Sequence, residues 1–187
     1  MIRLRWKLEV LLLAWVLGSL GCASSKGPLP VLDPVGPISG MPFRPSKTSI
    51  PGQIQVYTLA LRYNDGGVIY NPNTPYDLFD ANGKFIVHVR NATSLSDQVA
   101  EVVSVRGGLY FIRAQGPALG PVVIPVLVMP EQMTFVNIQQ LGRPAYLKDA
   151  NADWVRLPGG WPVGRRAAFQ EGVPRPEQLS TPPSLAR

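Results

Sequence analysis

The sequence contains very few of the residues from which catalytic and metal sites are usually built. Its 187 residues include one cysteine, Cys22, and one histidine, His88. A single cysteine excludes an intramolecular disulfide, and the N/S ligands of a zinc site cannot be assembled. A Ser-His-Asp site would have to use His88, and no nucleophile-elbow motif is present. We therefore predict no catalytic residues, no metal and no cofactor, and we interpret His88 as an ordinary surface residue.

Charge is also scarce and is not clustered. Charged residues make up 16% of the chain, the formal net charge is +6, and after the N-terminal region the basic residues are scattered singly except at Arg165-Arg166. A nucleic-acid-binding surface needs a basic patch or stripe. We therefore expect no nucleic acid among the partners of this protein.

The apolar run near the N-terminus is too short to cross a membrane as a helix. Val10 to Leu20 spans about 11 residues, whereas ~30 Å of hydrocarbon takes about 20. The run follows the basic residues Arg3, Arg5 and Lys7 and leads to small residues, which is signal-peptide anatomy. We predict a signal peptide over residues 1–21, and a retained transmembrane anchor is the weaker alternative.

The end of this segment, Ser19-Leu20-Gly21-Cys22, resembles the lipobox of bacterial lipoproteins, although Ser19 stands where the family prefers a leucine. The resemblance implies that Cys22 becomes the first residue and carries a diacylglyceryl group, with palmitate-type chains that attach the protein to membrane lipid. Ala23 stands where an aspartate would commonly mark inner-membrane retention. The implied location is the outer membrane, facing the periplasm or the cell surface. The alternative is an ordinary secretory signal with an incidental cysteine.

Residues 22–52 are rich in proline and carry no sustained hydrophobic periodicity. Seven prolines lie between Ala23 and Gly52. We predict a tether behind the lipidated Cys22, which would span about 30 Å as a coil and up to ~90 Å as polyproline II. In the alternative, the apolar residues Val31, Leu32 and Ile38 pack onto the domain as an irregular arm.

Residues 53–165 alternate between apolar, β-branched runs and turn residues, which predicts an all-β domain. The strongest signal is Asp80-Ala81-Asn82-Gly83-Lys84, since Asn-Gly is a preferred hairpin turn with φ > 0 at both residues. Asn64-Asp65-Gly66-Gly67 predicts a second hairpin after a first strand from Gln53 to Tyr63. Pro125, inside the run from Val122 to Val128, predicts an edge or bulged strand there.

The pattern of the Asp80 to Lys84 turn, followed by Gly108 to Ala114, Val122 to Val128 and Thr134 to Ile138, resembles transthyretin-like, carboxypeptidase-regulatory-like Ig folds. The resemblance implies a single antiparallel β-sandwich of a mostly non-catalytic kind, and it transfers no functional residue. Residues 166–187 are rich in proline, and we predict that they form a disordered tail.

Three aromatic residues, Tyr146, Trp154 and Trp161, are the candidate binding residues. If exposed, they would form a stacking platform for sugars or for a partner; in the alternative they belong to the core or cover one end of the sandwich. The segment from Asp149 to Asp153 begins like a calcium loop, but the glycine and the glutamate that the loop needs further on are missing. We interpret this segment as a solvated polar turn.

Together these patterns favour a lipid-anchored cell-envelope protein that is not an enzyme. Its β-sandwich would contact another envelope protein or a cell-wall polymer. A carbohydrate-binding accessory module is the alternative function.

Overall fold

The computed structural model describes residues 29–39, 41, 50–60, 62–92, 99–116, 120–139 and 153–169. These residues form strands, turns and extended segments, and no helix occurs among them, so the predicted all-β class is confirmed. The signal peptide, Cys22, Tyr146, the segment from Asp149 to Asn151 and the tail beyond residue 169 lie outside the described residues.

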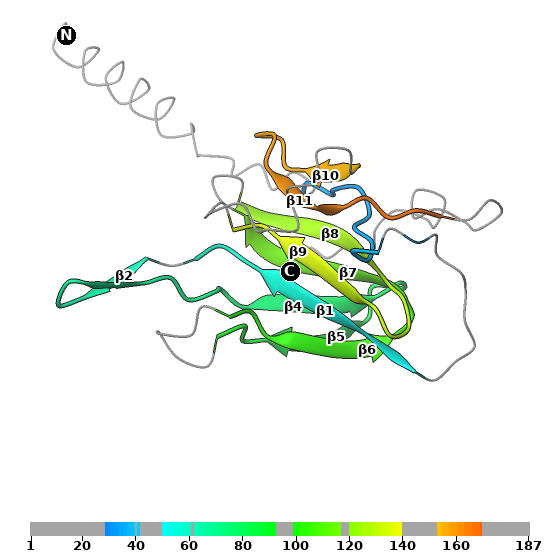
Figure 1. The fold of residues 1–187 in the computed structure, drawn as a ribbon, viewed down its shortest axis with the longest axis horizontal. Helices are drawn as coiled ribbons and strands as arrows, with labels where there is room; N and C mark the ends of the chain where they lie inside the picture. Colours follow the sequence, from blue (N-terminus) through cyan, green and yellow to red (C-terminus); the bar gives the residue numbers. More distant parts are fainter. Residues whose placement is uncertain are drawn as a thin grey trace, which may run out of the picture.

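The larger sheet has four antiparallel strands in the order β5-β4-β7-β8 (Figure 1). Its strands are β4 (Tyr76–Asp80), β5 (Phe85–Val89), β7 (Gly108–Gly116) and β8 (Gly120–Val128). A tight turn joins β4 to β5, whereas the neighbours β4 and β7 are separated in sequence by β5 and by a strand of the second sheet. Strand β8 ends the sheet, which is the edge position that Pro125 predicts.

The second sheet has three strands in the order β6-β1-β9. Its strands are β1 (Pro51–Tyr57), β6 (Val102–Arg106) and β9 (Met133–Asn137). Strand β6 pairs with β1 antiparallel, whereas β9 pairs with β1 in parallel. This parallel pair departs from the purely antiparallel arrangement that the Ig-like resemblance implies.

The two sheets pack face to face around one apolar cluster, as in a β-sandwich. The three-stranded sheet contributes Ile54, Val56 and Val136, and the four-stranded sheet contributes Leu78 and Ile112, among others. These side chains follow the two-residue period of a strand, which places alternate residues on the inner face. Burying this apolar surface is the dominant favourable term in the stability of the domain.

An N-terminal arm, residues 29–38, runs beside the outer edge of β8 (Figure 1, blue). Its backbone exchanges hydrogen bonds with β8: Leu32 N donates to Val123 O (3.0 Å) and Val35 N donates to Pro125 O (2.9 Å), while Leu127 N donates to Val35 O (2.8 Å). The side chain of Val35 is fully buried in the main core. The described part of the predicted tether therefore pairs with the fold as an arm. Leu32 packs against the core as the arm alternative expects, but Val31 and Ile38 are exposed and the buried anchor is Val35.

A small hairpin, β10 (Trp154–Arg156) and β11 (Pro162–Arg165), lies on the same side of the molecule as the arm (Figure 1). Gly36 N donates to Arg165 O (2.8 Å), Ala167 N donates to Pro34 O (2.8 Å), and Arg166 forms ion pairs with Asp33 and Asp153. The arm and this hairpin close one side of the sandwich. Arg166 and Ala167, at the start of the predicted tail, thus also contact the arm.

A second hairpin, β2 (Tyr63–Asp65) and β3 (Val68–Tyr70), extends away from the two sheets (Figure 1). Its turn uses Gly66 and Gly67, both with positive φ, as the sequence predicts. The single long strand expected from Gln53 to Tyr63 is wrong, because β1 ends at Tyr57. There Thr58 turns toward the chain before β4: its backbone N–H donates to Asn73 Oδ1 (3.2 Å) and its hydroxyl donates to Thr74 O (2.6 Å).

The hairpin between β4 and β5 is confirmed, but its turn differs from the expected one. Gly83 has φ 77°, whereas Asn82 is not among the residues with positive φ. Gly83 N donates to Asp80 O, and the Asp80 carboxylate accepts from the backbone N–H groups of Asn82 and Lys84, each at 2.9 Å. The side chain of Asp80 therefore holds a longer turn that needs a left-handed residue at one position only.

The close approach of Gly164 to the arm gives a direct test of this packing. A Cβ atom on Gly164 would lie 2.5 Å from Val35 Cγ1 and 2.7 Å from Phe135 O, so Gly164→Ala should force the arm away and destabilise the domain by about 1–3 kcal/mol. Gly159→Ala is the matched control, because a Cβ there meets nothing within 4 Å. Urea denaturation of the two variants measures the difference, and equal midpoints would show that the arm does not pack against β11.

Candidate interaction surface

Opposite the arm, the sandwich presents two strand edges that no described residue covers. Strand β5 ends the four-stranded sheet and strand β6 ends the three-stranded sheet, and the two lie near each other on the side away from β10 and β11 (Figure 1). Among the residues that the structure describes, no strand pairs with the outer edge of either. A free edge exposes a row of backbone N–H and C=O groups that can pair with another chain.

A groove of about 660 Å³ runs between these two edges. Its lining comprises Val87, His88, Val89, Arg90, Ala92, Glu101, Val102, Val103 and Ser104. The lining mixes aliphatic side chains with a few polar ones and contains no phenylalanine, tyrosine or tryptophan. We name the β5 edge, the β6 edge and this groove the open side.

Large apolar side chains are exposed at the open side. Phe85 is 52% exposed and Ile86 43% exposed on β5, while Val102 on β6 and Val99 just before it are exposed to a similar or greater degree. The edges of β8 and β9 differ: the arm pairs with β8, and Ile38 N donates to Met133 O of β9 at 3.3 Å. Among the residues that the structure describes, the arm therefore pairs along the β8 edge and touches one end of the β9 edge, while the β5 and β6 edges have no partner strand.

Asn91 lies at the end of β5, where the chain leaves one sheet for the other. It is fully buried and adopts φ 63°, a left-handed conformation that asparagine tolerates better than most residues. Its Nδ2 group lies within hydrogen-bond distance of Val56 O (2.8 Å), Thr58 Oγ1 (3.0 Å) and Thr74 O (3.2 Å). Its Oδ1 accepts from Glu101 N (3.1 Å). One side chain thus joins β1, the segment before β4 and the segment before β6.

Sequence reasoning did not find this residue. Asn91-Ala92-Thr93 matches a glycosylation sequon, a pattern unrelated to the buried role of Asn91. The one available signal is an asparagine two positions after the end of an apolar strand, and that signal is common at ordinary turns.

Replacing Asn91 should therefore cost much stability. In Asn91→Ala, the buried acceptors and the N–H of Glu101 lose their partner, and leaving such groups unsatisfied costs about 1–3 kcal/mol each, so we expect a loss of about 3 kcal/mol or more. Asn82→Ala, at an exposed position, should change the free energy of unfolding by less than about 0.5 kcal/mol. Chemical denaturation of both variants measures these changes. A loss for Asn91→Ala no larger than that for Asn82→Ala would contradict the role assigned to Asn91.

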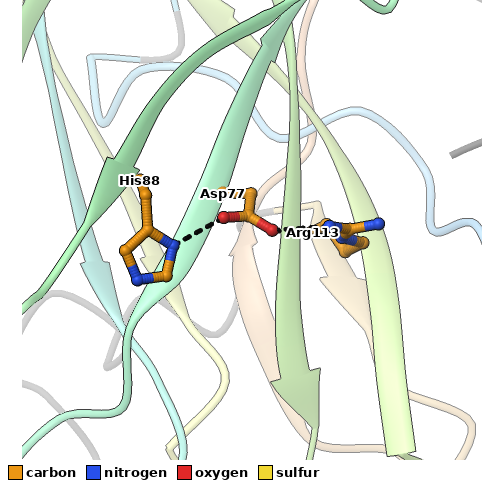
Figure 2. Close-up of polar contacts among 3 residues, drawn as sticks. All are labelled: Asp77, His88 and Arg113. Atoms are coloured by element: carbon orange, nitrogen blue, oxygen red, sulfur yellow. Dashed lines mark hydrogen bonds and ion pairs between the residues drawn. The ribbon is translucent and has the colours of Figure 1, made fainter. Parts of the chain in front are cut away.

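A row of three charged or polar side chains crosses the outer face of the larger sheet (Figure 2). His88 on β5 contacts Asp77 on β4, with 2.7 Å between His88 Nδ1 and Asp77 Oδ1, and Arg113 on β7 donates to Asp77 Oδ2 through Nη2 (2.7 Å) and Nε (3.2 Å). The three residues are cross-strand neighbours in the register of the sheet.

This row links β5, β4 and β7, and its contacts favour the ionised form of the central carboxylate. Partial burial raises the pKa of the Asp77 carboxyl, but the hydrogen bonds and charges of His88 and Arg113 outweigh that effect and hold the pKa below its ordinary value. Asp77 is therefore a carboxylate whose two oxygens are both engaged, which suits cross-strand pairing rather than proton donation. Arg113 also lies over the ring of Phe79, 5.4 Å from its centroid. His88, half exposed, lies on the surface that the sequence predicts for it.

The structure places two of the three candidate aromatic residues, Trp154 and Trp161, on and beside the β10–β11 hairpin. Both are half-buried, and Trp161 packs against the main core cluster with its Nε1 atom buried. Trp154 borders a small space beside Ile38 and Phe135. These two rings lie on the closed side of the sandwich, remote in the fold from the groove. Tyr146 and Cys22 fall outside the described residues.

The described residues contain no group of three side chains able to hold a metal ion, and no helix among them is long and apolar enough to span a membrane. Comparison with known proteins gives no match: no family model fits the chain, and no curated protein and no solved structure is significantly similar to it.

Proposed function

We propose that this chain is a lipid-anchored cell-envelope protein whose sandwich-like domain binds another protein through its open side. The observation that carries the proposal is the pair of uncovered strand edges beside a groove, with Phe85, Ile86 and Val102 exposed. Exposed apolar patches commonly mark interaction sites, and here they coincide with strand edges that no described residue covers.

The chemistry of the groove favours a protein over a sugar polymer. Sugar-binding surfaces use flat aromatic rings, whereas the groove is lined by valines and by the polar groups of His88, Arg90, Glu101 and Ser104. The tryptophans that could stack on a sugar are half-buried on the other side of the domain. A free strand edge offers backbone hydrogen bonds, which are suited to another polypeptide.

The anchor rests on the lipobox resemblance at Cys22, and the arm limits how far that anchor could hold the domain from the membrane. Leu29 already packs against the cluster of Phe79, Phe111 and Val123 on the outer face of the larger sheet. Only residues 23–28 separate it from Cys22. A chain of seven peptide units extends at most about 25 Å. The proposed anchor would therefore keep the domain close to the bilayer, within a far shorter reach than a free tether ending at residue 52 would allow.

Lipidation of Cys22 is testable in cells. Wild-type protein should incorporate labelled palmitate and fractionate with membranes, because two or three acyl chains give persistent attachment where one gives only marginal binding. Cys22→Ser removes the one thiol without changing the apolar run, so it should be exported yet stay unlabelled and unprocessed. If wild-type protein takes up no label, or if the variant is cleaved and fractionates as wild type does, an ordinary secretory signal replaces the lipoprotein signal.

The interaction itself is testable by site-specific photocrosslinking in the native host. A photoreactive residue at Ile86, on β5, should give a discrete adduct with one envelope protein, identified by mass spectrometry and reproduced from a photoreactive residue in that protein. Val68 on the projecting β2–β3 hairpin is the matched control, because it is exposed to a similar degree. The same adducts from both positions, or none from Ile86, would refute binding through the open side. An adduct with wall glycan at Ile86 would favour a polymer partner.

A further inference from the structure

Of the two open edges, that of β5 is better suited to pair with an additional strand. Between Phe85 and Val89 it contains no proline and no lysine, glutamate or aspartate, and its one ionisable residue, His88, is held by Asp77. Natural sheets protect exposed edges with proline, charge or a covering segment. The opposite edge, β8, carries Pro121 and Pro125 and is covered by the arm. Strand β5 contains no proline and no such charge, and no described segment covers it; the one protective feature is a bulge at Ile86, where β5 faces Leu78 and Phe79.

The inner face of β5 leads into the groove. Val87 and Val89 pair in register with Leu78 and Tyr76, which belong to the main core, and both valines also line the groove, with Val103 of β6 among the residues opposite. A strand added beside β5 would direct alternate side chains toward this space. A volume of about 660 Å³ accommodates several aliphatic side chains.

The charges around β5 indicate the character of the added strand. Lys84 precedes β5 and Arg90 follows it, and neither forms an ion pair with a described residue. A second copy of β5, added antiparallel about Val87, would place Lys84 opposite Arg90, and like charges directly opposite destabilise a strand pair. A strand with acidic residues near its ends would instead pair with both cations.

From these three observations we propose that the partner supplies an extended segment that adds to the edge of β5, apolar at alternate positions and acidic at its ends. This inference rests on the proposed function and names the chemistry of its partner. Backbone pairing supplies the affinity, the groove selects aliphatic side chains, and Lys84 and Arg90 select acidic ends.

A synthetic peptide tests the proposal with the full-length protein in detergent. The probe is Glu-Val-Thr-Val-Thr-Val-Glu with blocked ends; its controls have lysine at both ends or proline at the central position. The probe should bind at least about tenfold more tightly than either control, because proline removes a ladder hydrogen bond and lysine opposes Lys84 and Arg90. Hydrogen exchange should show new protection over Phe85–Val89 and none over β6.

Two sets of variants separate edge pairing from unspecific binding. Ile86→Lys places a charge on the edge and should weaken probe binding at least about tenfold, whereas Val68→Lys, at a residue exposed to a similar degree, should not. The double variant Lys84→Glu with Arg90→Glu should reverse the preference, so that the lysine-ended peptide binds more tightly.

Several results of these experiments would contradict strand addition at β5. Equal binding of all three peptides, no binding, protection outside β5, or an unchanged preference in the double variant would overturn strand addition at β5. Self-association of the protein through β5, seen by sedimentation, would overturn it in favour of a second copy. If the photocrosslink from Ile86 identifies a partner while the peptide fails, the proposed function stands and only strand addition falls; if both fail, both fall.

Discussion

The backbone pairing between the N-terminal arm and β8 is the constraint on which the rest of the architecture depends. Without it, β8 would present seven consecutive buried residues, from Val122 to Val128, at an uncovered sheet edge. Val35 forms two backbone hydrogen bonds with this edge: its N–H donates to Pro125 O, and its C=O accepts from Leu127 N. Its side chain completes the core between β8 and β11. Because Pro125 has no N–H to offer, its carbonyl alone pairs with the arm, and proline costs nothing at this position.

The opposite side is held by a different kind of interaction. No described strand bridges β5 and β6, and the buried amide of Asn91 ties the chain there to β1 and to the segments before β4 and β6. Gln55 adds a second polar link, since its Nε2 donates to Ala100 O at 2.9 Å. Buried, hydrogen-bonded amides favour a single geometry because every lost hydrogen bond there is costly. These amides can therefore hold the two sheets in place on this side although no strand joins the edges of β5 and β6.

Whether a feature of the fold could be predicted from the sequence depends on how far apart along the chain its interacting residues lie. The Asp80 to Lys84 hairpin and the Gly66-Gly67 hairpin are determined by residues next to each other, and both were found. The end of β1 at Tyr57 was missed, because it depends on Thr58 meeting Asn73 and Thr74 across a loop. The arm resembles a free linker in composition, since prolines that favour extended backbone serve a tether and an edge-covering strand equally well. The open side could not be predicted either, because the pattern from Phe85 to Val89 indicates an apolar strand whether its edge is paired or free.

The placement of the arm and the open side gives the proposed anchor a geometric consequence. The arm joins the four-stranded sheet at β8, and the order β5-β4-β7-β8 puts the β5 edge three strand spacings away, on the order of 14 Å. A lipid at Cys22 would therefore pull on the covered edge of the sheet and leave the uncovered edge unobstructed by its own linker. Since the linker reaches no more than about 25 Å, a partner that adds a strand at β5 must itself reach close to the membrane surface. Lipid attachment would also confine the protein to a layer in which the effective concentration of such a neighbour is high, so that even a short strand with modest intrinsic affinity could stay bound.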